Sequence, residues 1–430
     1  MSDSVNRRRF LGSSVATAAG VALTNQVAAQ ATNAASRTVV LGVMGLERGL
    51  AVATQFAKVS NVKIKYVCDI DASRADRAKS RIDKMPGQKT AAIGDFRRIL
   101  DDKEVDALVC AAPNHWHGPA TILGCAAGKH VYVEKPCSHT PAEGEMMVAA
   151  ARKHRRLVQL GTQRRSSPTV IEAIAKVHSG AIGRAYSARC CFSKLRGPIG
   201  KGKQVAVPSN LDYELWQGPA PPRPYVDNLV HYNWHWRWHW GNGELGNNGI
   251  HVVDLARWGM QVDYPSRVVS SGQRYRFDDD QETPDTHMVA YEFGDAGQIT
   301  WQGLSHNKRY SPFLSFYGEQ GTLEMGIMGE YKIYDAQDKV VEDVPAPVLW
   351  GRTEHAENYV EAVRNDDAGI LTQEIESGHK STMLCHLGNI AQRTGRTIEC
   401  DAHTGHILHD DRAIAAHWSK EYAKGWEPKV

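Results

Sequence analysis

The sequence predicts an α/β protein with two domains, the first built on a doubly wound parallel sheet and the second on antiparallel strands. Short apolar runs alternate with helix-like segments up to about residue 161, with no hairpin signal between them. Beyond that point, alternating strands are joined by turns that contain Gly or Asp. The chain has 430 residues and 42% of them are hydrophobic, which is enough for two separate cores.

The N-terminal 1–31 segment has the features of an export signal. Arg7 and Arg8 are followed by Phe10 and Leu11, which is the twin-arginine pattern, and a weakly apolar stretch then leads to a small-residue cleavage point. We therefore expect a signal peptide recognised by the twin-arginine export machinery. The mature protein is expected to be periplasmic or otherwise exported.

The charge and the cysteine pattern of the sequence argue against a nucleic-acid partner and against disulfide bonds. A formal net charge of +3 gives no support for a nucleic-acid partner. The eight cysteines contain no CxxC pair, and twin-arginine substrates fold in the reducing cytoplasm, so we expect no disulfide framework. A protein exported in the folded state can carry a cofactor that is not available outside.

The first domain is expected over residues 37–161. Right-handed crossovers between its strands would make a parallel sheet, whose ligands bind beyond the carboxyl ends of the strands. The predicted strands lie in the runs TVVLGVMG, VKIKYVC, VDALVCAAP, HVYVEKP and LVQLGT, and the predicted helices cover residues 49–58, 72–84, 116–127 and 141–154.

The first strand ends in the turn GVMGLERGL. A dinucleotide site needs glycines here so that the backbone can approach a pyrophosphate at a helix N-terminus. Gly45 and Gly49 are present, but the GxGxxG spacing is not, and Glu47 and Arg48 stand where small residues are expected.

The second strand closes with Asp69, at the spacing from the glycine turn at which an acid binds an adenosine ribose diol. The combination of strand, glycine turn, helix and terminal acid predicts a dinucleotide site. The acid favours NAD, and the nearby Arg74 keeps NADP as the alternative.

The stretch HVYVEKPCSHTPAEGEM, residues 130–146, places Glu134, Lys135 and Pro136 at the carboxyl end of a buried strand. A helix then begins after the N-cap Thr140. Such a lysine is either one half of a solvated charge pair in an ordinary loop or a positioned catalytic amine. The preceding strand ends at the same edge, in AAPNHWHGPA.

Four ordered motifs, PNHWH, VYVEKP, GTQRR and GELGNNGIHVVDLARW, resemble those of the Gfo/Idh/MocA family, which includes glucose–fructose oxidoreductase and inositol dehydrogenase. The resemblance covers roughly residues 37–400. It implies an NAD(P)-binding Rossmann domain, a C-terminal α+β domain over 162–430 with a large open, mainly antiparallel sheet, assembly as a homodimer or homotetramer, and a sugar or cyclitol substrate. The cofactor contacts it implies are Gly45, Gly49, Asp69, Pro113, Asn114, His117, Glu134, Lys135 and Gln163.

The run HYNWHWRWHW repeats His231, His235 and His239 every four residues, which on a helix would give zinc-like ligands on one face. The run also has a period of two that puts its tryptophans on alternate positions, and this favours an extended segment. We therefore expect no metal, and an aromatic wall with a polar face that binds sugar, with core packing as the alternative. The candidate sugar contacts here are Trp238 and Arg237.

In GELGNNGIHVVDLARW, glycines lead into a helix on which His251 and Asp254 share a face. In the family motif the matching histidine faces the nicotinamide and serves in acid–base chemistry, and imidazole titrates near neutrality. The motif usually has an aspartate four residues earlier, where this chain has Asn247, whose amide cannot take a proton. The resemblance thus implies that Lys135 and His251 are catalytic, and Asn247, His251 and Asp254 are candidate substrate contacts.

These features predict an exported NAD(P)-dependent oxidoreductase acting on a sugar or cyclitol hydroxyl, with a cofactor that is retained and recycled. A desolvated Lys135 would have a lowered pKa and could take the hydroxyl proton. One alternative is an NAD-dependent enzyme that cleaves a glycosidic bond without net redox change. A second is a binding protein that has lost catalysis, which Glu47 and Asn247 favour.

Overall fold

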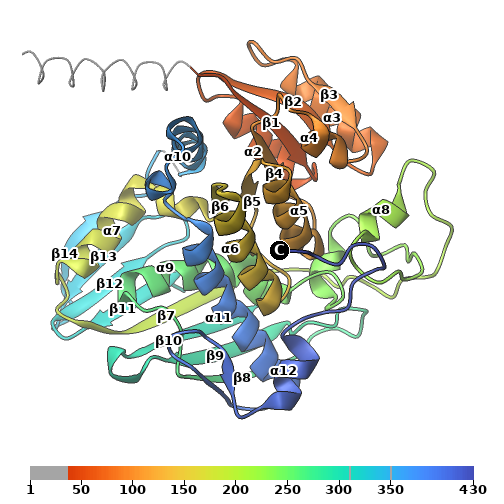
Figure 1. The fold of residues 1–430 in the computed structure, drawn as a ribbon. Helices are drawn as coiled ribbons and strands as arrows, with labels where there is room; N and C mark the ends of the chain where they lie inside the picture. Colours follow the sequence, from red (N-terminus) through yellow and green to blue (C-terminus); the bar gives the residue numbers. More distant parts are fainter. Residues whose placement is uncertain (1–36, 309–310, 349–350) are drawn as a thin grey trace, which may run out of the picture.

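The computed structural model describes residues 37–308, 311–348 and 351–430, so the predicted signal peptide lies outside the described residues. The first domain is a six-stranded parallel sheet in the order β3-β2-β1-β4-β5-β6 (Figure 1). The predicted doubly wound parallel sheet is confirmed. Its strands are β1 Val39–Met44, β2 Val62–Cys68, β3 Ala91–Ile93, β4 Ala107–Cys110, β5 His130–Val133 and β6 Val158–Leu160.

Helices cover both faces of this sheet, as the alternating pattern requires. The helix after β5 begins where the sequence predicts, because the Thr140 hydroxyl caps the amide of Glu143 at 3.4 Å and Pro141 occupies the first helical position. The helices are α2 Arg48–Phe56, α3 Ala72–Ile82, α4 Arg97–Asp101, α5 Asn114–Ala126 and α6 Pro141–His154.

The second domain is a ten-stranded open sheet in the order β14-β13-β12-β11-β7-β10-β9-β8-β15-β16. The pair β7–β10 is parallel and the others are antiparallel, which confirms the predicted mainly antiparallel sheet. Its strands are β7 Ala185–Ser193, β8 Arg267–Gln273, β9 Thr286–Glu292, β10 Gln298–Leu304, β11 Leu314–Gly318, β12 Gly321–Met325, β13 Tyr331–Asp335, β14 Val340–Val344, β15 Ile398–Cys400 and β16 Ile407–Leu408.

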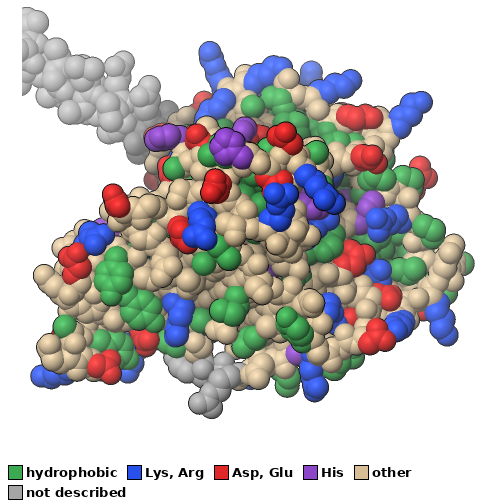
Figure 2. All heavy atoms as spheres, turned by 90° about the horizontal axis from the view of Figure 1, so that it is seen from below, with side chains coloured by type: hydrophobic (Ala, Val, Ile, Leu, Met, Phe, Trp, Pro, Cys, Tyr) green, Lys and Arg blue, Asp and Glu red, His purple; other side chains and the backbone are tan. Residues whose placement is uncertain are grey.

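Three helices, α7 Pro168–His178, α9 Ile250–Met260 and α11 Ile375–Thr394, pack on one face of the large sheet (Figure 1). The molecule seen from below shows hydrophobic side chains scattered among charged ones (Figure 2). Met288 on β9 and Val269 on β8 are among the exposed hydrophobic residues of the sheet. The homo-oligomer stays a prediction.

Helix α10, Arg352–Asn365, follows the strands of the second domain but packs on the first. Tyr359 is fully buried, with ring centroids 5.9 Å from Phe56 of α2 and 5.7 Å from Tyr132 of β5. The core of the first sheet is therefore completed by a segment far along the chain.

The crossing segment, residues 194–240, leaves the second domain and returns to the first (Figure 1). It contains the short helix α8, Tyr213–Gln217. The amide of Asp212 donates to Ile70 O at 2.9 Å, and the amide of Ala72 donates to Asn210 O at 3.1 Å, so the segment is tied to the loop after β2. Among the described residues, no helix is long and apolar enough to span a bilayer.

Candidate active site

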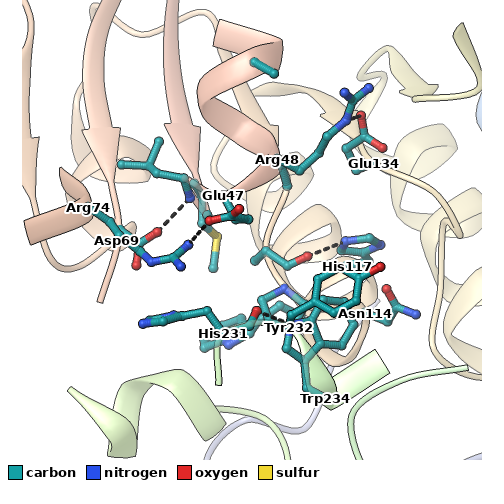
Figure 3. Close-up of a pocket in the computed structure, with 18 of the residues that line it drawn as sticks. Glu47, Arg48, Asp69, Arg74, Asn114, His117, Glu134, His231, Tyr232 and Trp234 are labelled. Carbon is teal, nitrogen blue, oxygen red and sulfur yellow. Dashed lines mark hydrogen bonds and ion pairs between the residues drawn. The ribbon is translucent and has the colours of Figure 1, made fainter. Parts of the chain in front are cut away.

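A cavity of about 480 Å³ lies at the carboxyl ends of the parallel strands, where the first domain meets the crossing segment and the start of α9 (Figure 3). Gly49 does not line it, but donates its amide to Gly45 O at 3.1 Å. The cavity brings together most of the predicted site residues, namely Gly45, Asp69, Pro113, Asn114, His117, Glu134, Lys135, Gln163, Asn247 and His251.

Asp69 lies at one end of this cavity and braces the glycine turn. Its carboxylate accepts the amide of Leu46 at 2.7 Å and that of Asp71 at 3.0 Å, and burial raises its pKa. Each oxygen keeps a lone pair that can accept a ribose hydroxyl. Gly45 has φ +83°, and a Cβ there would lie 2.5 Å from Ala112 N, so the turn needs glycine. The residues therefore fit a dinucleotide.

Replacing Asp69 with alanine is expected to weaken NAD binding about 10- to 150-fold, the value of a charge-assisted hydrogen bond of about 1.5–3 kcal/mol. Titration calorimetry of the variant with NAD measures the change. Asp76→Ala is the matched control, because Asp76 is exposed on the neighbouring helix. Unchanged affinity in Asp69→Ala would place the ribose elsewhere.

Glu47 lines the cavity at the glycine turn. Its side chain is 64% exposed and forms an ion pair with Arg74 (Figure 3). The turn is therefore not blocked by the acid that replaces a small residue.

His117 and Asn114 act at the edge of the sheet by holding neighbouring segments. The ring nitrogens of His117 lie 2.6 Å from Pro136 O and 2.8 Å from Ala112 O, which joins the ends of β4 and β5. Asn114 donates to Asn242 Oδ1 at 2.8 Å and so links the two domains.

Lys135 is held at the other end of the cavity. Its Nζ donates to the backbone oxygen of Asn247 at 2.8 Å and to the side-chain oxygen of Asn247 at 2.9 Å. Burial lowers the pKa of Lys135 to about 8, against the opposing effect of the Glu134 carboxylate. A large share of these amines is therefore neutral near pH 8 and able to accept a proton.

Glu134 holds the residues around this lysine in place. Its Oε1 accepts Arg48 Nε at 3.0 Å and Gln163 Nε2 at 2.9 Å. Burial alone would raise the pKa of Glu134, but the charges of Arg48 and Lys135 outweigh it and hold that pKa below its ordinary value. The ionised carboxylate thus joins the glycine turn, the lysine and the segment after β6.

Asn247→Asp is expected to raise the pKa of Lys135, because a carboxylate would replace the amide oxygen 2.9 Å from its ammonium. If the neutral amine is the reactive form, the rising limb of the pH–rate profile moves to higher pH in this variant. Initial rates between pH 6 and 10 test this. An unmoved limb would show that Lys135 does not control it.

Asn247 belongs to a π-helical turn, Leu245–Gly249, that leads into α9. Such turns are frequent at functional sites. One turn later stands His251, whose buried Nδ1 has no hydrogen-bond partner among the described residues. Burial first, and then the charge of Lys135, holds the pKa of His251 well below its ordinary value. The expectation that this imidazole titrates near neutrality is therefore wrong, and His251 is a neutral group that faces the cavity.

Asp254 is not a substrate contact, because it is fully buried away from the cavity. Its carboxylate accepts Arg165 Nη2 at 2.8 Å and Nε at 2.9 Å, Gln373 Nε2 at 2.8 Å and Ser381 Oγ at 2.6 Å. It shares a helix with His251, but it faces the interior and joins three segments there.

Arg237 and Trp238 also lie outside this cavity, so their assignment as sugar contacts is corrected. Arg237 donates to Asp280 at 3.0 Å, and Trp238 packs beneath Arg393, whose guanidinium carbon is 4.8 Å from the ring centroid. The tryptophan run is not extended, because Asn233–Trp236 forms a 3₁₀ helix.

The three histidines of this run point to different partners. His231 Nε2 lies 3.0 Å from Asp71, His235 Nδ1 lies 2.6 Å from Tyr232 O, and His239 Nε2 lies 2.8 Å from Pro221 O. Within the described part of the chain, no three His, Cys, Asp or Glu side chains gather as metal ligands.

Several cavity residues were not singled out by the sequence analysis, although some of them lie inside the motifs PNHWH, GTQRR and HYNWHWRWHW. The aromatic lining comes from other positions than Trp238. Two arginines come from the 3₁₀ helix Gln163–Ser166 and from the start of α10. The missed lining residues include Trp116, Arg164, Trp216, Tyr232, Trp234 and Arg352.

Comparison with known families defines the class of protein. Residues 36–162 match the NAD-binding Rossmann fold of the Gfo/Idh/MocA oxidoreductases, and residues 197–421 match the C-terminal alpha/beta domain of the same oxidoreductase family. The chain belongs to the Gfo/Idh/MocA oxidoreductase family, and its first domain is an NAD-binding Rossmann domain.

The matching curated relatives include inositol 2-dehydrogenase of Salmonella typhimurium, 32% identical over 29% of this chain and 37% of that protein. A glycosyl hydrolase family 109 protein of Shewanella sp. is 29% identical over 35% of this chain and 37% of that protein. The matches span less than half the length of these relatives. The structure of levoglucosan dehydrogenase with NADH and levoglucosan shares the fold, with a TM-score of 0.67, 18% identity, and coverage of 84% of this chain and 99% of that chain.

Proposed function

We propose that the protein is an exported NAD-dependent oxidoreductase that acts on a carbinol of a sugar or cyclitol. The observation that carries the proposal is Lys135, a half-buried amine with a pKa of about 8 that faces the same cavity as the neutral His251. The cofactor, when bound, supplies the hydride acceptor. The similarity to inositol 2-dehydrogenase and the shared fold with levoglucosan dehydrogenase support the substrate class.

In this reaction the substrate hydroxyl gives its proton to Lys135 Nζ, and the adjacent C–H bond breaks with its electron pair leaving as hydride. The carbinol carbon is oxidised to a carbonyl. Asn247 orients the amine through its two oxygens, and the neutral His251 lines the same cavity.

We further propose that the cofactor is retained and recycled between two sugars. The crossing segment supports this, because Asn210 and His231 both reach Asp71, each at 3.0 Å, beside the predicted ribose acid. The twin-arginine pattern supports export of the folded, loaded protein, since free nicotinamide cofactor is not available outside the cytoplasm.

Mass spectrometry of the nucleotide released from purified, dialysed protein tests the proposal, followed by a sugar screen monitored at the NADH absorbance. We expect the protein to release NAD(H) in near-stoichiometric amount. We also expect at least one sugar or cyclitol to reduce the bound NAD to NADH. Protein that releases no nicotinamide nucleotide and forms no NADH with added NAD would contradict the proposal and favour a binding protein.

A second candidate function is glycoside cleavage without net redox change, and the similarity to a glycosyl hydrolase family 109 protein favours it. There, transient oxidation, elimination and re-reduction would use the same lysine and cofactor. The products distinguish the two functions, because cleavage releases a free sugar or aglycone and leaves no oxidised product.

A further inference from the structure

We infer that the imidazole of His235 is a fixed hydrogen-bond acceptor for a second hydroxyl of the substrate, one that does not react. The site therefore selects a sugar or cyclitol in which this hydroxyl is free. The inference rests on the proposed function and names a specificity-determining residue for that same site. It is carried by the hydrogen bonds of His235 and by its place in the cavity.

One nitrogen of the His235 ring is committed to the protein. Nδ1 lies 2.6 Å from the carbonyl oxygen of Tyr232. A carbonyl oxygen can only accept a hydrogen bond, so Nδ1 carries the ring proton and donates it. Burial lowers the pKa of His235 to about 3, with a smaller contribution from the charge of Lys135. The ring is therefore neutral at physiological pH, and Nε2 carries a lone pair.

The other nitrogen, Nε2, is open to the cavity. His235 is half-buried and lines the cavity together with Lys135 and His251. No group of the described residues forms a hydrogen bond with Nε2. The buried side-chain atoms that lack a partner include Nδ1 of His251 but no atom of His235, so solvent reaches Nε2. Its lone pair can therefore accept a hydrogen bond from a molecule bound in the cavity.

Aromatic packing fixes the plane of this ring. Trp234 stacks on His235, with 3.6 Å between the ring centroids and 20° between the ring planes. On Tyr232 the ring centroid lies 4.6 Å from that of the imidazole. The indole nitrogen of Trp234 donates to His231 O at 3.0 Å, so the stacking partner is itself anchored. The direction of the Nε2 lone pair is therefore set before a substrate binds.

Hydrogen bonds through Arg196 join this stretch to the turn that holds the reactive amine. Arg196 Nη1 donates to the Tyr232 hydroxyl at 3.0 Å, and its Nε donates to Glu244 at 2.8 Å. Glu244 directly precedes the π-helical turn whose Asn247 accepts two hydrogen bonds from Lys135. The acceptor nitrogen and the amine therefore belong to one braced unit that lines the same cavity.

The position of His235 favours the substrate over the cofactor as the donor. His231, four residues earlier, lies 3.0 Å from Asp71, at the ribose end of the cavity. His235 instead lies close enough to Lys135 for the ammonium charge to act on its ring. The hydroxyl that reacts donates to Lys135, so a different hydroxyl of the same substrate is available to Nε2. A neutral acceptor suits the hydroxyl of a neutral polyol.

Monofluorinated sugars test the inference on the full, cofactor-loaded protein, because fluorine removes a hydroxyl donor with little change in size. D-glucose, D-galactose and myo-inositol are each compared with their deoxyfluoro analogues, position by position, by titration calorimetry. We expect fluorine at one position of at least one parent, other than the oxidised one, to raise Kd about three- to tenfold. This penalty should be equal at pH 6 and pH 9, because the ring is neutral at both.

His235→Phe keeps a ring against Trp234 but removes the acceptor nitrogen. The backbone oxygen of Tyr232 still accepts the amide of residue 235 at 3.3 Å. In this variant the fluorine penalty should disappear at that one position and persist at the others. His235→Gln, which can place an amide oxygen near Nε2, should retain part of it. His239→Phe is the matched control, because His239 also bonds a backbone oxygen and packs on Trp240 but lies outside this cavity.

Nitrogen-15 NMR of the unsubstituted protein keeps the inference testable if His235→Phe does not fold. The Nε2 signal, assigned by its loss in His235→Gln, should have the shift of an unprotonated nitrogen. It should move when the parent sugar is added and stay in place with the fluorinated analogue.

Fluorine penalties that are the same in His235→Phe and in the unsubstituted protein at every position would overturn the inference and leave the oxidoreductase intact. Loss of NAD affinity in His235→Phe with unchanged penalties would assign Nε2 to the cofactor and overturn it as well. A penalty that depends on His235 without NADH formation would support the inference while contradicting the proposed oxidation. No binding of any parent sugar would overturn both.

Discussion

Replacing Lys135 with alanine is expected to lower turnover by about two to four orders of magnitude, the usual value of a positioned acid–base group. In the unsubstituted protein, kcat/KM should rise with pH and level off above a midpoint near the lysine pKa of about 8. The neutral amine is the form that takes the hydroxyl proton, so the rate rises as the ammonium loses its proton. This limb of the profile should be absent in Lys135→Ala.

The same variant should still bind NAD, because the acid that braces the glycine turn, Asp69, lies at the other end of the cavity. The Glu134 carboxylate also keeps Arg48 as a partner at 3.0 Å, so the fold should survive. His251→Ala serves as a companion variant, with reduced turnover but with the limb near pH 8 preserved. Normal turnover in Lys135→Ala would remove the lysine from the mechanism.

The second large effect concerns stability. Asp254→Ala is expected to destabilise the protein by about 3–5 kcal/mol, because Arg165 would be left buried without its carboxylate. Burial opposes ionisation of Asp254, but Arg165 outweighs it and holds its pKa below the ordinary value. Urea unfolding followed by circular dichroism measures the loss.

A solvent-exposed ion pair provides the control for this prediction. Glu319→Ala removes a carboxylate 3.0 Å from Arg184, but both side chains are more than half exposed, so the unfolding midpoint should move far less. A carboxylate with a lowered folded-state pKa stabilises above its unfolded-state pKa of about 4 and loses that contribution as pH falls through the folded-state pKa. The Asp254→Ala penalty should therefore shrink in acid. Equal losses of unfolding free energy in Asp254→Ala and Glu319→Ala at pH 7 would contradict the prediction that the buried ion pair contributes more to stability.

The sequence predicted those elements whose residues act through local structure, such as apolar runs and helix caps. The parallel strands follow from apolar runs separated by helices, and the start of α6 follows from Thr140 and Pro141. Strand β3, Ala91–Ile93, was missed because only one of its three side chains, that of Ile93, is buried, so it does not form an apolar run. The end of β5 placed Lys135 at the sheet edge because consecutive parallel strands must end on the same side.

Long-range packing explains what the sequence could not indicate. The tryptophan run has the period of a strand, yet Trp234 and Trp240 are buried in a cluster that includes Trp216, and a 3₁₀ turn is needed to put them there. Asp254 has the spacing of a site residue, and only the position of Arg165 shows that it faces inward. Arg352 reaches the cavity because α10 packs on the other domain.

That packing of α10 also sets the order in which the protein can be built. As the ribosome releases the chain, the six strands of the first sheet emerge long before Tyr359, which fills the space beside Phe56 and Tyr132. The hydrophobic core of the first domain therefore stays incomplete until most of the second domain has been synthesised. A gene fragment ending after β6 should therefore yield an aggregation-prone polypeptide. The two domains therefore fold as one unit, although the sequence pattern indicates two separate domains.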